Sequence, residues 1–151
     1  MAVARRSHRL AVHRRTILLL YRDIRTSHIG IIDGIQSKKY IVVETHRRDG
    51  RAVRTPVWFF VKGGKIYVVT RSGTGKAKRL RNNKRVRIAE CTIKGKVTGP
   101  WASGTAGILD DVQTKETVRL RDKKYGMMAR IAKFLSSGKG DWFAFSVTLD
   151  Q

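Results

Sequence analysis

The chain has 151 residues and a mass of 17.1 kDa, enough for one domain with a substantial core. Its composition of 41% hydrophobic and 29% charged residues, with two prolines, excludes a disordered or low-complexity chain. Lysine and arginine number 33 against 11 aspartates and glutamates, which gives a formal net charge of +22 and favours a polyanionic partner or ligand.

The single cysteine, Cys91, excludes an intrachain disulfide bond and fits a reducing compartment, so the sequence predicts a cytoplasmic protein. The longest apolar run, residues 17–21, is far shorter than the ~20 residues that span a bilayer. We therefore expect no membrane span.

Residues 5–25 are predicted to form a basic amphipathic helix, because seven arginines face one acid there and apolar residues recur at helical spacing. The helix either packs on its own domain or a second subunit, or binds nucleic acid or a membrane surface. Residues 1–22 also have the composition of an organellar transit peptide. We treat residues 1–37 as a basic N-terminal helical arm.

From residue 40 onward the hydrophobic period changes to two, which indicates β-strands. Asp49-Gly50 is typical of a hairpin turn, where a positive φ is needed. Six strands, mostly antiparallel, are predicted over residues 40–45, 53–61, 66–71, 86–91, 97–109 and 143–149. A curved sheet of this size closes into a small barrel whose interior is filled by side chains, so a ligand must lie outside it.

Two helical segments interrupt the strands. The first, residues 76–83, is short, polar and basic. The second, residues 114–135, is expected to be split at Gly126 and to carry an apolar stripe that packs in the core, formed by Met127, Met128, Ile131, Phe134 and Leu135.

Catalysis by protein side chains is not indicated. The four histidines (His8, His13, His28 and His46) fall outside the common metal-ligand spacings, so no metal site is predicted. No nucleophile-elbow pattern occurs either. We therefore name no catalytic side chain.

The turn over residues 70–79 joins a strand to a helix through small, glycine-rich residues, which directs backbone N–H groups and a helix dipole at one spot. Lys76, Lys78 and Arg79 place cations around it, as a phosphate site requires. The pattern is not a P-loop, because Thr70 and Ala77 stand where that motif needs Gly and Ser or Thr. A solvated basic helix would have the same sequence features.

Pro56 lies inside a predicted strand, where it removes a ladder donor. Two interpretations stay open: protection of an edge strand, or a planar ring lying against the strand.

Several motifs share the order and spacing of one known family: residues 40–45, Asp49-Gly50, 54–59, 69–70, 72–73, 76, 79–80, 85–86, 104–106 and 124–126. Together they resemble the pyridoxamine 5′-phosphate oxidase-like (FMN-binding) split-barrel family, and within it the branch of deazaflavin (coenzyme F-420)-dependent enzymes. The resemblance covers about residues 40–149 and leaves the basic arm outside. It implies a mainly β fold, a six-stranded antiparallel split β-barrel with flanking helices, as a cofactor-binding domain over residues 38–151.

The resemblance also implies a homodimer with two cofactor sites at the subunit interface. Lys76 matches the family's phosphate-binding lysine. Some members carry Arg where this chain has Gly75, so Lys78 or Arg79 is expected to assist. By the family's pattern the ring system and ribityl chain are contacted by Arg54, Thr55, Pro56, Val57, Trp58, Val69 and Thr70.

The function implied is that of an oxidoreductase, in which a bound deazaflavin coenzyme F-420 or FMN transfers hydride to or from a small-molecule substrate. The excess of lysine and arginine favours the deazaflavin, whose tail beyond the phosphate is anionic. A second hypothesis from the charge is a non-enzymatic basic split-barrel module that binds nucleic acid or another polyanion, with the N-terminal arm as one contact surface.

Overall fold

The structure is a computed structural model that describes residues 16, 18, 19, 27–138 and 140–151. The helix expected over residues 5–25 lies outside the described residues apart from Thr16, Leu18 and Leu19, which are helical.

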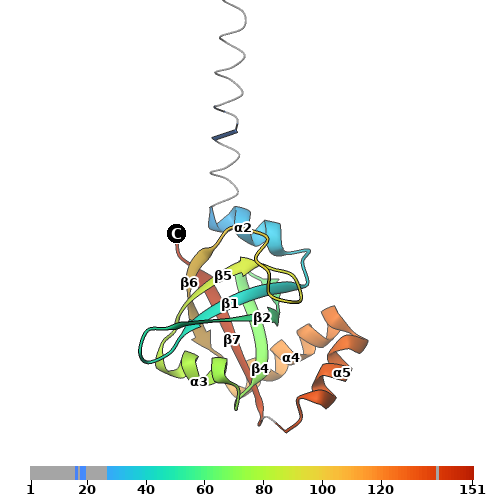
Figure 1. Cartoon of the computed structure of the whole chain (residues 1–151). Helices are drawn as coiled ribbons and strands as arrows, with labels where there is room; N and C mark the ends of the chain where they lie inside the picture. Colours follow the sequence, from blue (N-terminus) through green and yellow to red (C-terminus); the bar gives the residue numbers. More distant parts are fainter. Residues whose placement is uncertain (1–15, 17, 20–26, 139) are drawn as a thin grey trace, which may run out of the picture.

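One antiparallel sheet forms the body of the molecule (Figure 1). Its strands follow the chain order β1 (Tyr40–His46), β2 (Ala52–Trp58), β3 (Phe60–Lys62), β4 (Lys65–Arg71), β5 (Arg85–Glu90), β6 (Ala102–Ile108) and β7 (Trp142–Leu149). Within the sheet the order is β2-β1-β5-β6-β7-β4-β3, so β7 lies between β6 and β4. The expected mainly β fold with flanking helices is confirmed.

The sheet is rolled up, because its two edge strands, β2 and β3, follow each other in the chain with only Phe59 between them. β2 pairs with β1, whereas β3 pairs with β4. This is the split-barrel arrangement, but with seven strands instead of the predicted six. The single strand expected over residues 53–61 is divided, since the chain changes partner at Phe59 and leaves the ladder there.

The strand expected over residues 97–109 is also shorter than predicted. β6 begins at Ala102, and Val97 makes only an isolated bridge to Cys91. Gly99 and Pro100 lie between the two segments and interrupt the regular ladder.

Four helices surround the barrel: α2 (His28–Ile35), α3 (Gly75–Asn82), α4 (Asp111–Tyr125) and α5 (Met127–Leu135). α2 covers one end and α3 the opposite end, while α4 and α5 lie along one side (Figure 1). α2, which belongs to the stretch predicted as an arm, packs Ile31, Ile32 and Ile35 into the core.

The barrel interior is filled, as the sequence predicted. Strands contribute every second residue, such as Ile41 and Val43 of β1, both fully buried. α3 adds Ala77 and Leu80 from one end. A ligand therefore has no room inside, and any binding site must lie on the outside of the sheet or across its split.

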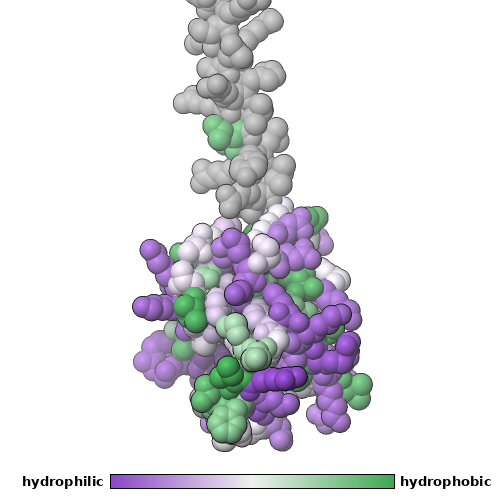
Figure 2. Space-filling model, turned by 90° about the vertical axis from the view of Figure 1, so that its right-hand side faces the viewer, coloured by the Kyte–Doolittle hydropathy of each residue, from purple (hydrophilic) through white to green (hydrophobic). Residues whose placement is uncertain are grey.

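Gly126 separates α4 from α5 as expected, at φ +55°. The prediction that the apolar stripe of α5 packs in the core is wrong: Met127 is 73% exposed and Phe134 is 82% exposed. Only Ala129 of α5 is buried, because the helix turns its small residue inward and its large ones outward. Figure 2 faces α4 and α5 and shows hydrophobic side chains gathered low on this face, bordered by hydrophilic ones.

Within the described part of the chain, no helix combines the length and apolar character needed to cross a bilayer.

Candidate functional site

A hollow of about 270 Å³ lies at the split of the barrel, where β2 and β4 approach each other without pairing. β4 pairs with β3 only as far as Tyr67, so from Val68 to Arg71 it has β7 on one side and a free edge on the other. β2 is an edge strand along its whole length. The hollow is lined by Pro56, Val57, Trp58, Val69, Thr70, Arg71, Thr74, Lys76, Arg121, Ala132, Ser136 and Trp142.

One corner of the hollow is polar and positively charged. The ammonium group of Lys76 donates to Thr70 Oγ1 at 3.0 Å, and Thr70 Oγ1 lies 3.3 Å from Thr74 Oγ1. Thr74 is the N-cap of α3 and accepts from the backbone N–H of Ala77. Hydroxyls, an ammonium group and a helix N-terminus therefore converge, which is the donor set that holds a phosphate.

The opposite wall is the edge of β2, formed by Pro56, Val57 and Trp58. The indole of Trp58 stacks on the ring of Tyr125 with the centroids 4.7 Å apart. Pro56 has no N–H to donate, so its position on an edge strand satisfies the edge-strand interpretation. The wall is formed by a proline, a valine and an indole and is partly apolar, which leaves the planar-ring interpretation open.

Tyr125 and Lys124 fix the link between β2 and β3. The Tyr125 hydroxyl accepts from the Phe59 N–H at 3.1 Å and lies 2.8 Å from the carbonyl oxygens of both Phe59 and Lys39. Lys124 Nζ donates to the Phe59 carbonyl at 2.8 Å. Burial raises the pKa of Tyr125 to about 12 and lowers the pKa of Lys124. Phe59 leaves the ladder, and these two side chains replace the hydrogen bonds that its backbone N–H and carbonyl would make within the sheet.

A third wall is formed by residues that the sequence analysis did not single out. The Arg71 guanidinium lies 3.5 Å from the centroid of the Trp142 ring, and the Arg121 guanidinium lies 4.5 Å from it. Arg121 is buried and pairs with Asp122 at 2.6 Å. These residues come from β4, α4 and β7. Long gaps in the sequence separate them, so no local pattern could identify them as a group.

The structure thus brings together six of the ten predicted site residues: Pro56, Val57, Trp58, Val69, Thr70 and Lys76. Arg54 and Thr55 do not line the hollow. Arg54 instead pairs with Glu44 at 2.8 Å and lies over the ring of Trp101 at 4.8 Å. Burial raises the pKa of Glu44, but Arg54 and Arg87 outweigh this effect and hold it below its usual value.

Lys78 and Arg79 are also outside the hollow. Lys78 is exposed on α3. Arg79 donates to Thr45 Oγ1 at 2.7 Å, and its guanidinium passes so close to Gly75 that a Cβ there would meet Arg79 Nη1 at 2.8 Å. Arg79 therefore fills the space beside residue 75.

Two other kinds of site come into question in the described part of the chain: a second cavity and a metal centre. A larger cavity, of about 510 Å³, lies between the β3–β4 hairpin and α4, but none of the ten predicted residues lines it. No cluster of three or more His, Cys, Asp or Glu that suits a metal ion occurs among the described residues.

Comparison with known proteins gives the family. The sequence profile described as pyridoxamine 5′-phosphate oxidase matches residues 31–151, which include every strand and every residue that lines the hollow. The chain belongs to the pyridoxamine 5′-phosphate oxidase family. No curated protein matches the sequence significantly.

Solved structures share the fold of this family member. Rv2991, a conserved hypothetical protein from Mycobacterium tuberculosis, is 18% identical with a TM-score of 0.62, covering 83% of this chain and 82% of that one. The heme storage protein HutZ from Vibrio cholerae is 16% identical with a TM-score of 0.61, covering 79% and 87%. A general stress protein 26 relative from Clostridium acetobutylicum is 20% identical with a TM-score of 0.57, covering 82% and 85%. Identities this low establish the fold alone.

Proposed function

We propose that this family member is an oxidoreductase that binds a flavin-type cofactor, FMN or the deazaflavin coenzyme F-420, across the split of its barrel. The observation that carries the proposal is the convergence of Thr70, Thr74 and Lys76 at the N-terminus of α3, in a hollow that Pro56, Val57 and Trp58 of β2 also line. A cationic, hydroxyl-lined corner and a partly apolar wall in one hollow suit a ligand that joins a ring system to a phosphate.

The residues present fit such a group. Lys76 and the hydroxyls of Thr70 and Thr74 would hold the phosphate, and Pro56 to Trp58 would lie against the ring. When bound, the cofactor supplies hydride transfer, and the protein supplies binding, orientation and electrostatics. No side chain is assigned a proton-transfer role, and the small-molecule substrate is not defined by this site.

We also propose that two copies of the chain assemble to complete the site. The hollow of about 270 Å³ in one protomer is smaller than the ~300–1,000 Å³ of typical ligand pockets, so a partner surface is needed to enclose a tricyclic ring. The exposed stripe of α5, with Ile131 at 60% and Phe134 at 82%, offers an apolar surface that a second copy would cover.

The choice between the two cofactors follows from charge. Arg71 lines the hollow in addition to Lys76 and has no carboxylate partner among the described residues, whereas Arg121 is paired with Asp122, so the site holds at least two cations. An anionic tail beyond the phosphate, as in coenzyme F-420, would be favoured by the additional cation, whereas FMN needs only one cationic corner. The single cysteine supports a reducing, cytoplasmic location.

Reconstitution tests the proposal. The purified full chain is incubated with FMN or with coenzyme F-420, passed through a desalting column and examined by visible absorbance. We expect one cofactor band to be retained at about one equivalent per protomer. If neither band is retained at any cofactor concentration up to the millimolar range, the proposed function is wrong.

A further inference from the structure

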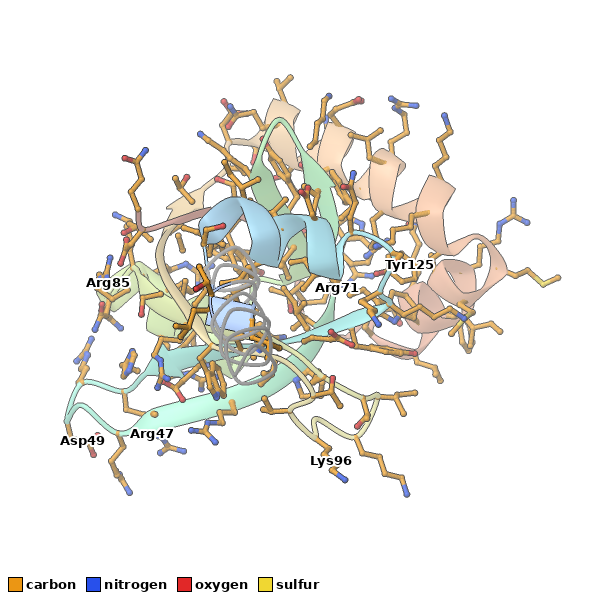
Figure 3. The ribbon with its side chains drawn as sticks, turned by 90° about the horizontal axis from the view of Figure 1, so that it is seen from above. Arg47, Asp49, Arg71, Arg85, Lys96 and Tyr125 are labelled. Carbon is orange, nitrogen blue, oxygen red and sulfur yellow. The ribbon has the colours of Figure 1, made fainter. Side chains whose placement is uncertain are left out.

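A second basic surface, the hairpin–α3 surface, is formed by Arg47 and Arg48 in the β1–β2 turn and by Lys78 and Arg79 on α3. The β1–β2 turn lies beside α3 at one end of the barrel (Figure 1). Arg79 connects the two elements through its 2.7 Å hydrogen bond to Thr45 of β1. Figure 3 shows Arg47 in the β1–β2 hairpin, next to Asp49 at its tip, with Tyr125 on the opposite side of the view. The proposed cofactor site uses none of these four cations.

The surface carries an excess of positive charge: Asp49 is the one acid in its two segments, and this carboxylate pairs with Arg51 and also interacts with the charge of Arg47. Among the described residues, no carboxylate lies within 4.0 Å of a cationic nitrogen of these four residues. Asp49, in the same turn, pairs with Arg51 at 2.8 Å, and Asp150, near the start of β5, pairs with Arg85 at 2.6 Å. The closest ion pairs of the neighbouring acids are thus with other arginines, and the surface keeps a net positive charge.

The cations are also crowded against one another. Burial lowers the pKa of Arg79, and the charge of Arg47 lowers it further. Arg47, Arg48 and Lys78 are exposed, so their charged groups are accessible to a ligand. An anion that bridged the hairpin and α3 would relieve this repulsion between like charges. The most complementary ligand is therefore a chain of regularly spaced anionic groups and not a single small anion.

The hairpin–α3 surface offers one ring to a nucleic-acid base, the half-buried imidazole of His46. The turn and α3 read HRRDGR and GKAKRLRN, with no Phe, Tyr or Trp. Proteins that bind single strands without sequence preference rely on such aromatic platforms, whereas contacts to duplex phosphates need only cations. We propose that the hairpin–α3 surface binds the phosphate backbone of double-stranded nucleic acid, without sequence preference and preferring duplex to single strand.

Charge reversal tests this proposal on the full chain. Fluorescence anisotropy follows the binding of a labelled duplex of about 20 base pairs between roughly 50 and 200 mM salt, because backbone contacts lower the affinity linearly on a log–log salt plot. The triple variant Arg47→Glu/Arg48→Glu/Lys78→Glu leaves the partly buried Arg79 in place. We expect it to weaken binding at least tenfold near 100 mM salt and to reduce the salt slope by about 2–3.

The matched control changes the net charge equally on α4 and α5, with Lys115→Glu/Lys123→Glu/Arg130→Glu, three exposed cations on the other side of the barrel. It should weaken binding by less than about threefold. If the two triple variants lose affinity equally, or if a single strand binds better than the duplex, the proposal is wrong.

Two further measurements separate the proposal from other causes. Thermal unfolding shows whether the triple variant folds, and if it does not, the glutamine version Arg47→Gln/Arg48→Gln/Lys78→Gln replaces it, with the same reduction in salt slope of about 2–3 expected because the same three cations are removed. Affinity for FMN or coenzyme F-420 should stay within about threefold, since the three residues lie outside the hollow. A triple variant that keeps full duplex affinity would place nucleic-acid binding elsewhere and overturn the assignment.

Discussion

Tyr125 is the residue through which α4 is tied to the barrel. Its ring stacks on Trp58, and its hydroxyl contacts backbone groups of Phe59 and Lys39. Burial raises its pKa from about 10 to about 12, so the folded protein favours the neutral phenol. The stability from the neutral group is therefore fully present below pH ~10 and is lost as pH rises through about 12.

Tyr125→Phe is predicted to lower the free energy of unfolding at neutral pH by about 1–3 kcal/mol, because the buried Phe59 N–H loses its acceptor. Urea unfolding at neutral pH measures this loss. Repeating it from pH 9 to 12 should show the gap between the wild type and the variant narrowing, since only the wild type has the raised tyrosine pKa. A gap that stays constant over this range would show that the phenol does not titrate as described.

Lys76 is predicted to be the main phosphate contact of the proposed cofactor site. A charged hydrogen bond contributes roughly 1.5–3 kcal/mol, so Lys76→Ala should weaken cofactor binding about ten- to a hundredfold, as measured by fluorescence titration. Thermal stability should change little, because Lys76 lies at the surface end of α3.

Lys78→Ala provides the matched control. On a regular helix Lys78 lies about 200° around the axis from Lys76, and the structure shows it exposed and outside the hollow. Its replacement should leave cofactor affinity within about threefold. Small, equal losses for both variants that disappear in moderate salt would mean that α3 is only a solvated basic face.

At the scale of elements, Gly126 sets the angle between α4 and α5. Its φ of +55° and ψ of −125° belong to a region that residues with a Cβ avoid. One residue therefore ends a helix of 15 residues and begins another of 9.

Gly126→Ala should destabilise the protein by about 1–3 kcal/mol, because alanine would have to adopt the positive φ of Gly126. No atom lies within 4 Å of the new Cβ, so a steric clash does not contribute. Gly34→Ala is the control, and we expect it to raise the free energy of unfolding. Gly34 lies inside α2 with open space around its Cβ position, so alanine should stabilise the protein by roughly 0.5–1 kcal/mol. Chemical denaturation of both variants gives the comparison. Equal effects would mean that backbone conformation does not explain them.

The strands could be predicted because each presents alternate residues to one core, and the Asp49-Gly50 turn could be predicted because Gly50 takes the positive φ that such a turn requires. The break at Phe59 could not. Residues 57–61 are all large and apolar, so the apolar run continues unbroken through Phe59. The break depends on the change of strand partner there and on hydrogen bonds from Tyr125, 66 residues away.

In the candidate site, too, residues close in sequence could be predicted, whereas residues brought together by long-range contacts could not. Thr70 and Lys76 are six residues apart, and one strand-to-helix turn is enough to bring them together, so local pattern revealed them. Arg121 and Trp142 meet Arg71 only after the barrel has closed. Arg54 lies close to these residues in sequence, but its guanidinium pairs with the buried carboxylate of Glu44 on β1 and does not line the hollow.

At the scale of the whole molecule, self-association is predicted. Light scattering at micromolar concentration should give twice 17.1 kDa. Ile131→Lys/Phe134→Lys places two charges on the exposed apolar stripe of α5 and should weaken association without unfolding the protomer, because neither residue is buried. A monomer that retains cofactor with full affinity would contradict the idea that a partner completes the site.

The position of β7 in the middle of the sheet has a consequence for how the chain folds. It pairs with β6 on one side and β4 on the other, joining residues such as Ile66 and Val147 that are far apart in sequence. Until residues 142–149 leave the ribosome, the β3–β4 hairpin has no partner and two strand edges stay uncovered. The contact order is therefore high, and folding is expected to be slow, with the uncovered strand edges open to wrong pairing until β7 has joined the sheet.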